Sequence, residues 1–274
     1  MFGNKNNRGV EDDRQLGRGF EDDRFSDRDR NINRSAGNRA AAYGEGGDIE
    51  TRSAVYVAKV MGWMCVGLLT TVVAAMAVLS IESLFMLVFG SGTAVIVIVV
   101  AQFACVIALS AAIQKMSVGV ATVTFIAYSA LTGLTMSVFV LIYELSSLLL
   151  AFSVTTFMFL SMAAYGFATK KDLTTLGRLA FFGLIGIIVA MIANFFLGNS
   201  MLDLGITILG VLVFTGLIAY DTQNIKGIYY NAMASGYDED SPEVRKLAIY
   251  GALKLYLDFI NLFIMLLRLL GRRR

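Results

Sequence analysis

The stretch LKLYLDFINLFIMLLRLLGRRR, from Leu253 to Arg274, is dominated by Leu, Ile and Phe. Near its middle stands Asp258, and Asn261 follows about one helical turn later. A run of about 20 mostly apolar residues is typical of a helix that crosses a membrane. A carboxylate at membrane depth is costly and is therefore usually functional. The stretch predicts a spanning helix that carries a functional carboxylate.

The composition of the whole chain agrees with a membrane protein. Of the 274 residues, 57% are hydrophobic and only 16% are charged, whereas soluble domains have about 25% charged residues. There is no His, so any pH response must come from carboxylates. Cys65 and Cys105 lie in apolar segments and are better interpreted as small hydrophobic residues than as a disulfide or a metal site. We expect no cofactor.

The first 50 residues form a separate, charged segment. In it RGVEDDRQLG is followed directly by RGFEDDRFSD, a repeat with a spacing of ten. Because both signs of charge alternate and aliphatic residues are scarce, residues 1–50 are predicted to be a disordered tail. The alternative is a tail that docks a partner protein. Nucleic-acid binding is not expected, because the acidic residues neutralise the basic ones.

Residues 51–274 are predicted to be an all-α polytopic membrane domain, a bundle of seven transmembrane helices in the lipid bilayer. Their continuously apolar runs exclude the alternation of a closed β-barrel. Short connections make the helices antiparallel neighbours. The predicted spans are Ala54–Ser80, Thr93–Ile113, Val118–Ile142, Ser146–Ala168, Leu179–Gly198, Gly205–Ile225 and Leu247–Leu270.

Charges in the connections predict the orientation, since basic residues favour the cytoplasmic side. Basic and acidic connections alternate, beginning with the acidic Glu82 and the basic Lys115. The N-terminus is therefore predicted to be cytoplasmic. If the last segment spans, GRRR lies outside, against the rule; if that segment is re-entrant, GRRR lies inside. We favour a span, because the first helices usually dominate topology.

A second carboxylate, Asp221, lies in GLIAYDTQNIKG near the end of the sixth predicted span. About 20 residues separate that span from the last one, so the two helices can pack side by side. Asp221 and Asp258 could then meet in a medium of low dielectric constant, where both cannot ionise cheaply. Sharing one proton would make them titrate as a pair and act as a pH sensor.

Neighbouring polar residues leave a structural alternative open. Lys254 lies four residues before Asp258, on the same helix face, and could form a plain ion pair with it. Asp221 could lie at a wet helix end beside Gln223, with Lys226 about one turn further along. The spacing alone does not decide between this arrangement and a carboxylate pair.

Several stretches together resemble the Bax inhibitor family, also called the transmembrane Bax-inhibitor-motif family. They include YGFATKKDLTTLG, FTGLIAYDTQNIK and GALKLYLDFINLFIMLLRLLG, in family order, and the resemblance covers about residues 50–271. It implies a seven-helix bundle with the last helix at its centre, a passive calcium leak, and suppression of cell death in eukaryotes. It also implies that Asp221 and Asp258 form a pH-sensing pair that closes the pore. Members often carry an Arg just before IQKMS, where this chain has Ala112.

Three functions compete. The first is a pH-gated calcium leak channel in which Asp221, Asp258 and Asn261 offer calcium a weak, transient site. The second is a membrane scaffold that regulates stress or proteolysis through protein partners. An intramembrane aspartic protease is not expected, because Asp258 lacks the preceding glycines of such enzymes. Without a targeting signal, the chain is predicted to lie in a bacterial cytoplasmic membrane.

Overall fold

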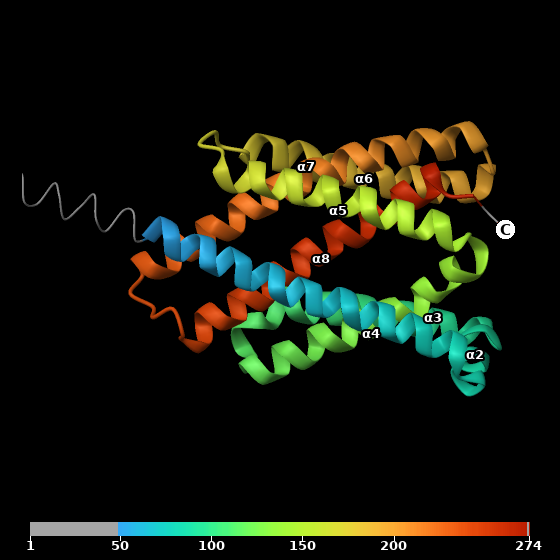
Figure 1. Cartoon of the computed structure of the whole chain (residues 1–274), viewed down its shortest axis with the longest axis horizontal. Helices are drawn as coiled ribbons and strands as arrows, with labels where there is room; N and C mark the ends of the chain where they lie inside the picture. Colours follow the sequence, from blue (N-terminus) through green and yellow to red (C-terminus); the bar gives the residue numbers. More distant parts are fainter. Residues whose placement is uncertain (1–48, 273) are drawn as a thin grey trace, which may run out of the picture. The chain divides into compact units, whose positions relative to one another are not determined.

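The computed structural model describes residues 49–272 and residue 274, and all the elements in this part of the chain are helical. The predictions about the tail lie outside it. A compact unit runs from Ser53 to Arg274. The helices are Ile49–Ser80, α2 (Glu82–Phe89), α3 (Gly92–Ala112), α4 (Val118–Ile142), α5 (Leu145–Ala168), α6 (Thr174–Leu197), α7 (Ser200–Ala234) and α8 (Pro242–Leu270), with a 3-10 turn η1 (Ile113–Lys115) (Figure 1).

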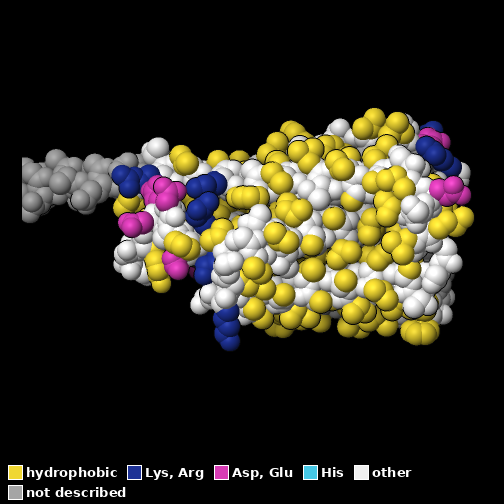
Figure 2. All heavy atoms as spheres, turned by 90° about the horizontal axis from the view of Figure 1, so that it is seen from below, with side chains coloured by type: hydrophobic (Ala, Val, Ile, Leu, Met, Phe, Trp, Pro, Cys, Tyr) yellow, Lys and Arg dark blue, Asp and Glu magenta, His cyan; other side chains and the backbone are white. Residues whose placement is uncertain are grey.

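Six helices of the described chain are long and apolar enough to cross a membrane. They match the first six predicted spans, although the fifth ends one residue earlier than predicted, at Leu197, so that part of the prediction is confirmed. Large apolar side chains cover their outer faces; Phe195 and Phe196, for example, are 85% and 81% exposed. Figure 2 shows this cover over the middle of one face, with charged side chains gathered at the two ends. Such a surface suits lipid rather than water.

Three boundaries differ from the predictions. The short helix α2 occupies a segment expected to be a loop and packs against α3. Helix α7 continues to Ala234, because the polar segment after Ile225 still buries Tyr229 and Ala232. Helix α8 begins earlier than expected, at Pro242, because Ser241 caps its first turn and Pro is favourable at that position.

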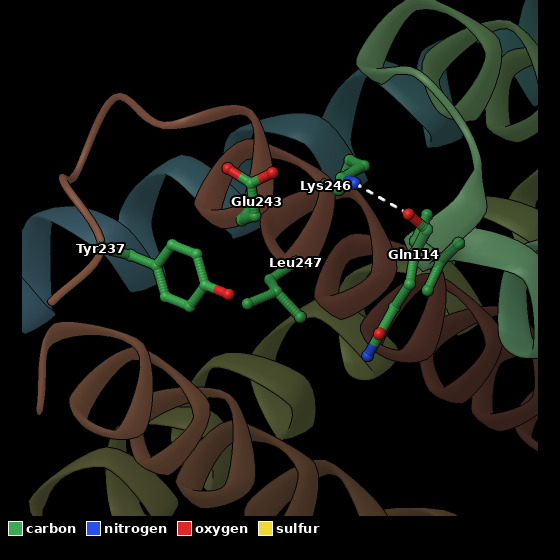
Figure 3. A pocket seen from close by; sticks show the side chains of 6 residues that line it. Gln114, Tyr237, Glu243, Lys246 and Leu247 are labelled. Atoms are coloured by element: carbon green, nitrogen blue, oxygen red, sulfur yellow. Dashed lines mark hydrogen bonds between the residues drawn. The ribbon is translucent and has the colours of Figure 1, made fainter. Parts of the chain in front are cut away.

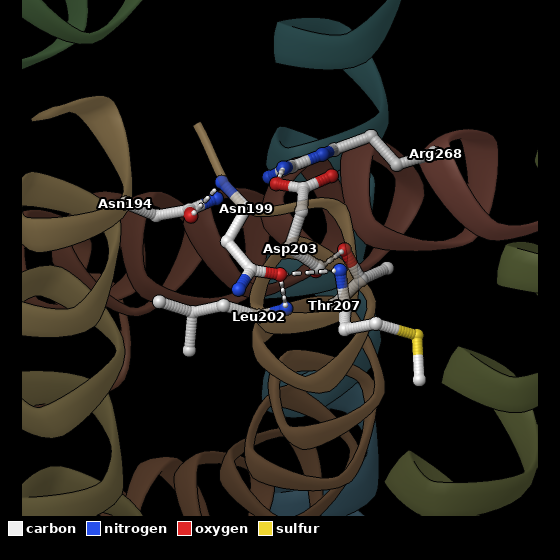
Figure 4. Close-up of polar contacts among 7 residues, drawn as sticks. Asn194, Asn199, Leu202, Asp203, Thr207 and Arg268 are labelled. Carbon is white, nitrogen blue, oxygen red and sulfur yellow. Dashed lines mark hydrogen bonds and ion pairs between the residues drawn. The ribbon is translucent and has the colours of Figure 1, made fainter. Parts of the chain in front are cut away.

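Helix α8 lies against α4, α5 and α7 and buries side chains along its whole length. Near its start, Lys246 donates a hydrogen bond of 3.1 Å to the backbone oxygen of Gln114, just beyond α3 (Figure 3). Near its end, Arg268 pairs with Asp203 in the first turn of α7 (Figure 4). The two ends of α8 therefore contact residues at opposite ends of the neighbouring helices.

The turn between α6 and α7 is built by two residues. Gly198 ends α6 in the left-handed region, with a φ of 61°, which suits a residue without a side chain. The side chain of Asn199 then caps α7 by accepting hydrogen bonds from the amides of Met201 and Leu202 (Figure 4). This tight turn brings Asp203 to the end of the bundle that Arg268 reaches.

Small residues allow the closest helix approach. A Cβ atom added to Gly166 of α5 would lie only 2.1 Å from the backbone oxygen of Ala219 in α7. Backbone atoms cannot move aside as a flexible side chain can. The contact between α5 and α7 therefore requires glycine at this position.

We predict that Gly166→Ala lowers the stability of the bundle, because α5 and α7 must separate to admit the methyl group. The expected loss is about 1–3 kcal/mol, as for other overpacked interiors. Thermal unfolding in detergent measures it. Gly186→Ala is the matched control, because an added Cβ at Gly186 meets nothing within 4 Å. Equal effects of the two substitutions would contradict the close approach.

Candidate functional site

A pocket of about 610 Å³ lies among α6, α7 and α8. Its polar and charged lining residues come from all three helices, and apolar side chains complete the wall. The polar and charged members are Arg178, Tyr220, Asp221, Lys254, Asp258 and Asn261. The structure thus brings Asp221 and Asp258 to one cavity, as the chain pattern suggested.

Lys254 and Asp221 form an ion pair across the contact between α7 and α8. The Lys254 ammonium lies 2.9 Å from Oδ1 of Asp221. The sequence had left open an ion pair between Lys254 and Asp258. That alternative is wrong, because Lys254 pairs with Asp221 instead. Side chains on a helix lean toward its N-terminus, so Lys254 leans away from Asp258 and toward the neighbouring helix.

Asp258 is the most deeply buried polar group of the pocket. It is 5% exposed, and its Oδ2 atom has no hydrogen-bond partner within the described part of the chain. The charges of both Asp221 and Lys254 act on it. Two carboxyl groups and one ammonium thus form a single electrostatic cluster inside an apolar bundle.

The other predicted site residues divide into two groups. Asn261 lines the pocket one turn beyond Asp258. Gln223 and Lys226 do not belong to the described pocket lining. The Lys226 ammonium instead lies 4.3 Å from the centre of the Phe167 ring in α5 and donates to the Phe167 backbone oxygen.

Gln223 holds the connection between α5 and α6. Its amide accepts a hydrogen bond from Leu173 and donates one to the backbone of Lys171. In the same connection, the hydroxyl and backbone amide of Thr174 both donate to Asp172. These bonds hold the pKa of Asp172 below its ordinary value. Their contribution to stability is therefore present at neutral pH and is lost as pH falls through that lowered pKa.

Two lining residues were missed as site residues. Arg178 precedes the predicted fifth span and was expected in a connection, but α6 starts at Thr174 and carries it into the pocket wall. Tyr220 reaches the wall because Gly177 allows a close approach: an added Cβ there would lie 2.6 Å from the Tyr220 ring. The sequence signal for both was the adjacent pair Gly177-Arg178, a small residue beside a charge.

Two further observations concern the position of the family Arg and the capacity of the pocket to hold a metal ion. Ala112, at the position of the family Arg, ends α3 and does not line the pocket. The described residues contain no cluster of three or more His, Cys, Asp or Glu side chains that could hold a metal ion. A cation in the pocket would therefore meet two carboxylates and the neutral Asn261 rather than a dedicated cage.

Comparisons with known proteins cover the whole bundle. Residues 53–274 match the family model described as Inhibitor of apoptosis-promoting Bax1. The Escherichia coli inner membrane protein YbhL is 47% identical over 220 residues, 80% of this chain and 92% of that protein. An uncharacterized Borreliella burgdorferi protein is 42% identical over 219 residues, again 80% and 92% of the two chains. The uncharacterized Rickettsia prowazekii protein RP147 is 40% identical, covering 80% and 90%.

We predict that Lys254→Ala destabilises the bundle, because it leaves the Asp221 carboxylate buried without its cation. The Lys254 side chain is 26% exposed, so the expected loss is about 2 kcal/mol, below that for a fully buried pair. Thermal unfolding in detergent measures it, with Lys170→Ala in the exposed connection as control. Adding Asp221→Asn should recover part of the loss; purely additive losses would contradict the pair.

Proposed function

The chain belongs to the Bax inhibitor family, and on that premise we propose that it is a pH-sensitive calcium leak channel gated where Asp221, Lys254 and Asp258 meet. One observation carries this proposal. The carboxyl group of Asp258 is buried beside an ion pair, and one of its oxygens has no partner in the described chain. A group in such surroundings responds strongly to gaining or losing a proton.

The charges of the cluster suggest how the gate works. The carboxylate of Asp221 and the ammonium of Lys254 neutralise each other, and the closed state is neutral if Asp258 carries a proton. Loss of that proton leaves a net negative charge between α7 and α8. At about 4 Å and an effective dielectric constant of about 20, two bare carboxylates repel by about 4 kcal/mol, and the attraction of Asp258 to the Lys254 ammonium offsets part of this. A repulsion of this size can overturn a closed state favoured by a few kcal/mol.

The same cluster offers a passage to cations rather than a permanent site. Two carboxylates and the side chain of Asn261 supply oxygen atoms, which calcium prefers. The tethered ammonium of Lys254 competes for Asp221, so calcium bound there is held weakly. Weak binding is what conduction requires. Arg178, in the wall of the same pocket, is a second positive charge and weakens calcium binding further.

Helix α8 is the seventh span and the centre of the bundle in this proposal. Its contacts with Gln114 and Asp203, at opposite ends of the other helices, support a full crossing. The N-terminus is cytoplasmic, because the basic connections then face the cytoplasm. The membrane is the bacterial inner membrane, where the Escherichia coli relative, inner membrane protein YbhL, is located.

The alternative function is a non-conducting scaffold that regulates stress or proteolysis through protein partners. No enzymatic reaction is part of either proposal. The two functions differ in a simple observable: a scaffold carries no calcium flux at any pH.

We expect purified full-length protein in liposomes to pass calcium faster as pH rises, because Asp258 loses its proton. Asp258→Asn should make the flux independent of pH, and Asp221→Asn should do the same, because removing either carboxylate removes the repulsion between them. The double variant should resemble the single ones. A fluorescent calcium indicator measures the flux.

Asp238→Asn is the matched control, because Asp238 is exposed in the connection before α8. It should retain the pH dependence of the unmodified protein. Unchanged pH dependence of the flux in Asp258→Asn would contradict the proposed role of Asp258 in gating. Absence of calcium flux in the unmodified protein would favour the scaffold.

Labelling of single cysteines tests the topology, in a background with Cys65→Ala and Cys105→Ala. An impermeant thiol reagent should reach Lys171→Cys only from the cytoplasmic side. It should reach Glu144→Cys and Arg274→Cys only from the outside, because α8 crosses the membrane. Labelling of Arg274→Cys from the same side as Lys171→Cys would show that α8 is re-entrant.

A further inference from the structure

A second cavity, of about 420 Å³, lies where the Ile49–Ser80 helix, the start of α4 and the start of α8 meet. It shares no lining residue with the pocket that contains Asp221 and Asp258. Because α4 begins at Val118, which lines this cavity, the cavity lies at the level where a spanning helix enters the membrane. We call it the end cavity. The proposed channel function does not use it.

The rim of the end cavity carries charges of both signs. Lys59 and Arg245 supply two cations, and Glu239 and Asp240 supply two carboxylates. Glu239 accepts a hydrogen bond of 2.7 Å from the Tyr229 hydroxyl. Lys59 and Asp240 are only loosely paired, at 3.9 Å, and the side chain of Asp240 is 97% exposed. Such a rim is complementary to a ligand that carries a negative and a positive group close together.

The floor of the end cavity is apolar but contains one unsatisfied polar atom. Trp63, Val244 and Ile249 supply apolar surface. The hydroxyl of Tyr56 is buried, and it has no hydrogen-bond partner among residues 49–272 and 274. A buried hydroxyl is costly when it is unpaired, so this one is suited to donate to an acceptor on a bound ligand.

We infer that the end cavity binds the headgroup of a zwitterionic phospholipid, one that carries a phosphate and a primary ammonium. The phosphate accepts from Tyr56, Lys59 and Arg245, and the ammonium donates to Asp240, with the negative charge of Glu239 beside it. The acyl chains lie in the surrounding bilayer. A lipid is the fitting source of this chemistry, because the first turns of α4, which line the cavity through Val118 and Thr122, also expose the apolar Val120 and Val123 on the outer surface.

The charges also define which headgroups are disfavoured. A purely anionic headgroup meets Asp240 and Glu239 without a positive group to match them. A quaternary ammonium is positive but has no N–H to donate to those carboxylates. The end cavity therefore selects an ethanolamine headgroup over a glycerol or a choline headgroup on the same chains.

Native mass spectrometry of the full-length protein tests this, with dioleoyl phosphatidylethanolamine, phosphatidylglycerol and phosphatidylcholine offered at equal concentration. The ethanolamine lipid should be retained at least about fivefold over the others, and Tyr56→Phe should lower its binding about fivefold, as expected for one lost hydrogen bond. Lys59→Gln should lower it too. Asp240→Asn should move the preference toward phosphatidylglycerol. Lys170→Gln, in the exposed connection, is the charge-matched control.

Retention of all three lipids to the same extent, or equal behaviour of Tyr56→Phe and Lys170→Gln, would overturn the assignment. Soluble glycerophosphoethanolamine should not displace the lipid, because it lacks the chains that anchor the headgroup in the bilayer; displacement at comparable concentration would assign the cavity to a soluble ligand instead. Calcium flux is not part of this readout, so the outcome is independent of the proposed channel.

Discussion

An ammonium paired with a carboxylate inside an apolar bundle is the interaction on which the structure of the pocket depends. Neither Lys254 nor Asp221 could remain charged alone at this depth without a large desolvation cost. Together they are tolerated, and they tie α8 to α7 at 2.9 Å. Asp258 then lies beside a pair that is already neutral, so its own protonation sets the net charge of the cluster.

This arrangement changes the interpretation of Ala112. The family resemblance suggests a guanidinium near the end of the second span as a partner of the aspartates, and this chain lacks it. The structure supplies a cation from α8 instead, through Lys254. Helix α8 therefore carries both Asp258 and the counter-charge of Asp221, and the cluster needs only the packing of α7 against α8.

The spans were predictable from sequence because bilayer thickness imposes a minimum length of apolar chain, which leaves a clear signal. The sequence allowed Asp221 and Asp258 to meet, because their segments are neighbours along the chain, but the spacing did not decide between this arrangement and separate ion pairs. The partner of Lys254 was not, because sequence spacing reports contacts within one helix and α7 offers a competing carboxylate. The position of Arg178 in the wall was missed because it depends on where α6 starts, and boundaries are poorly encoded. Likewise, α2 and the extension of α7 are stabilised by packing rather than by local pattern.

The two ion pairs between α7 and α8 share a polarity: Asp221 and Asp203 belong to α7, and Lys254 and Arg268 belong to α8. Because the helices are antiparallel, these pairs lie far apart along the contact and set its register twice. A helix advances about 1.5 Å per residue, so sliding α8 by even a residue or two stretches both pairs together. Helix α8 is thus held in register with α7 at two points. A displacement of α8 at Arg268 is therefore carried along the helix to Lys254, and so to the pocket that contains Asp258.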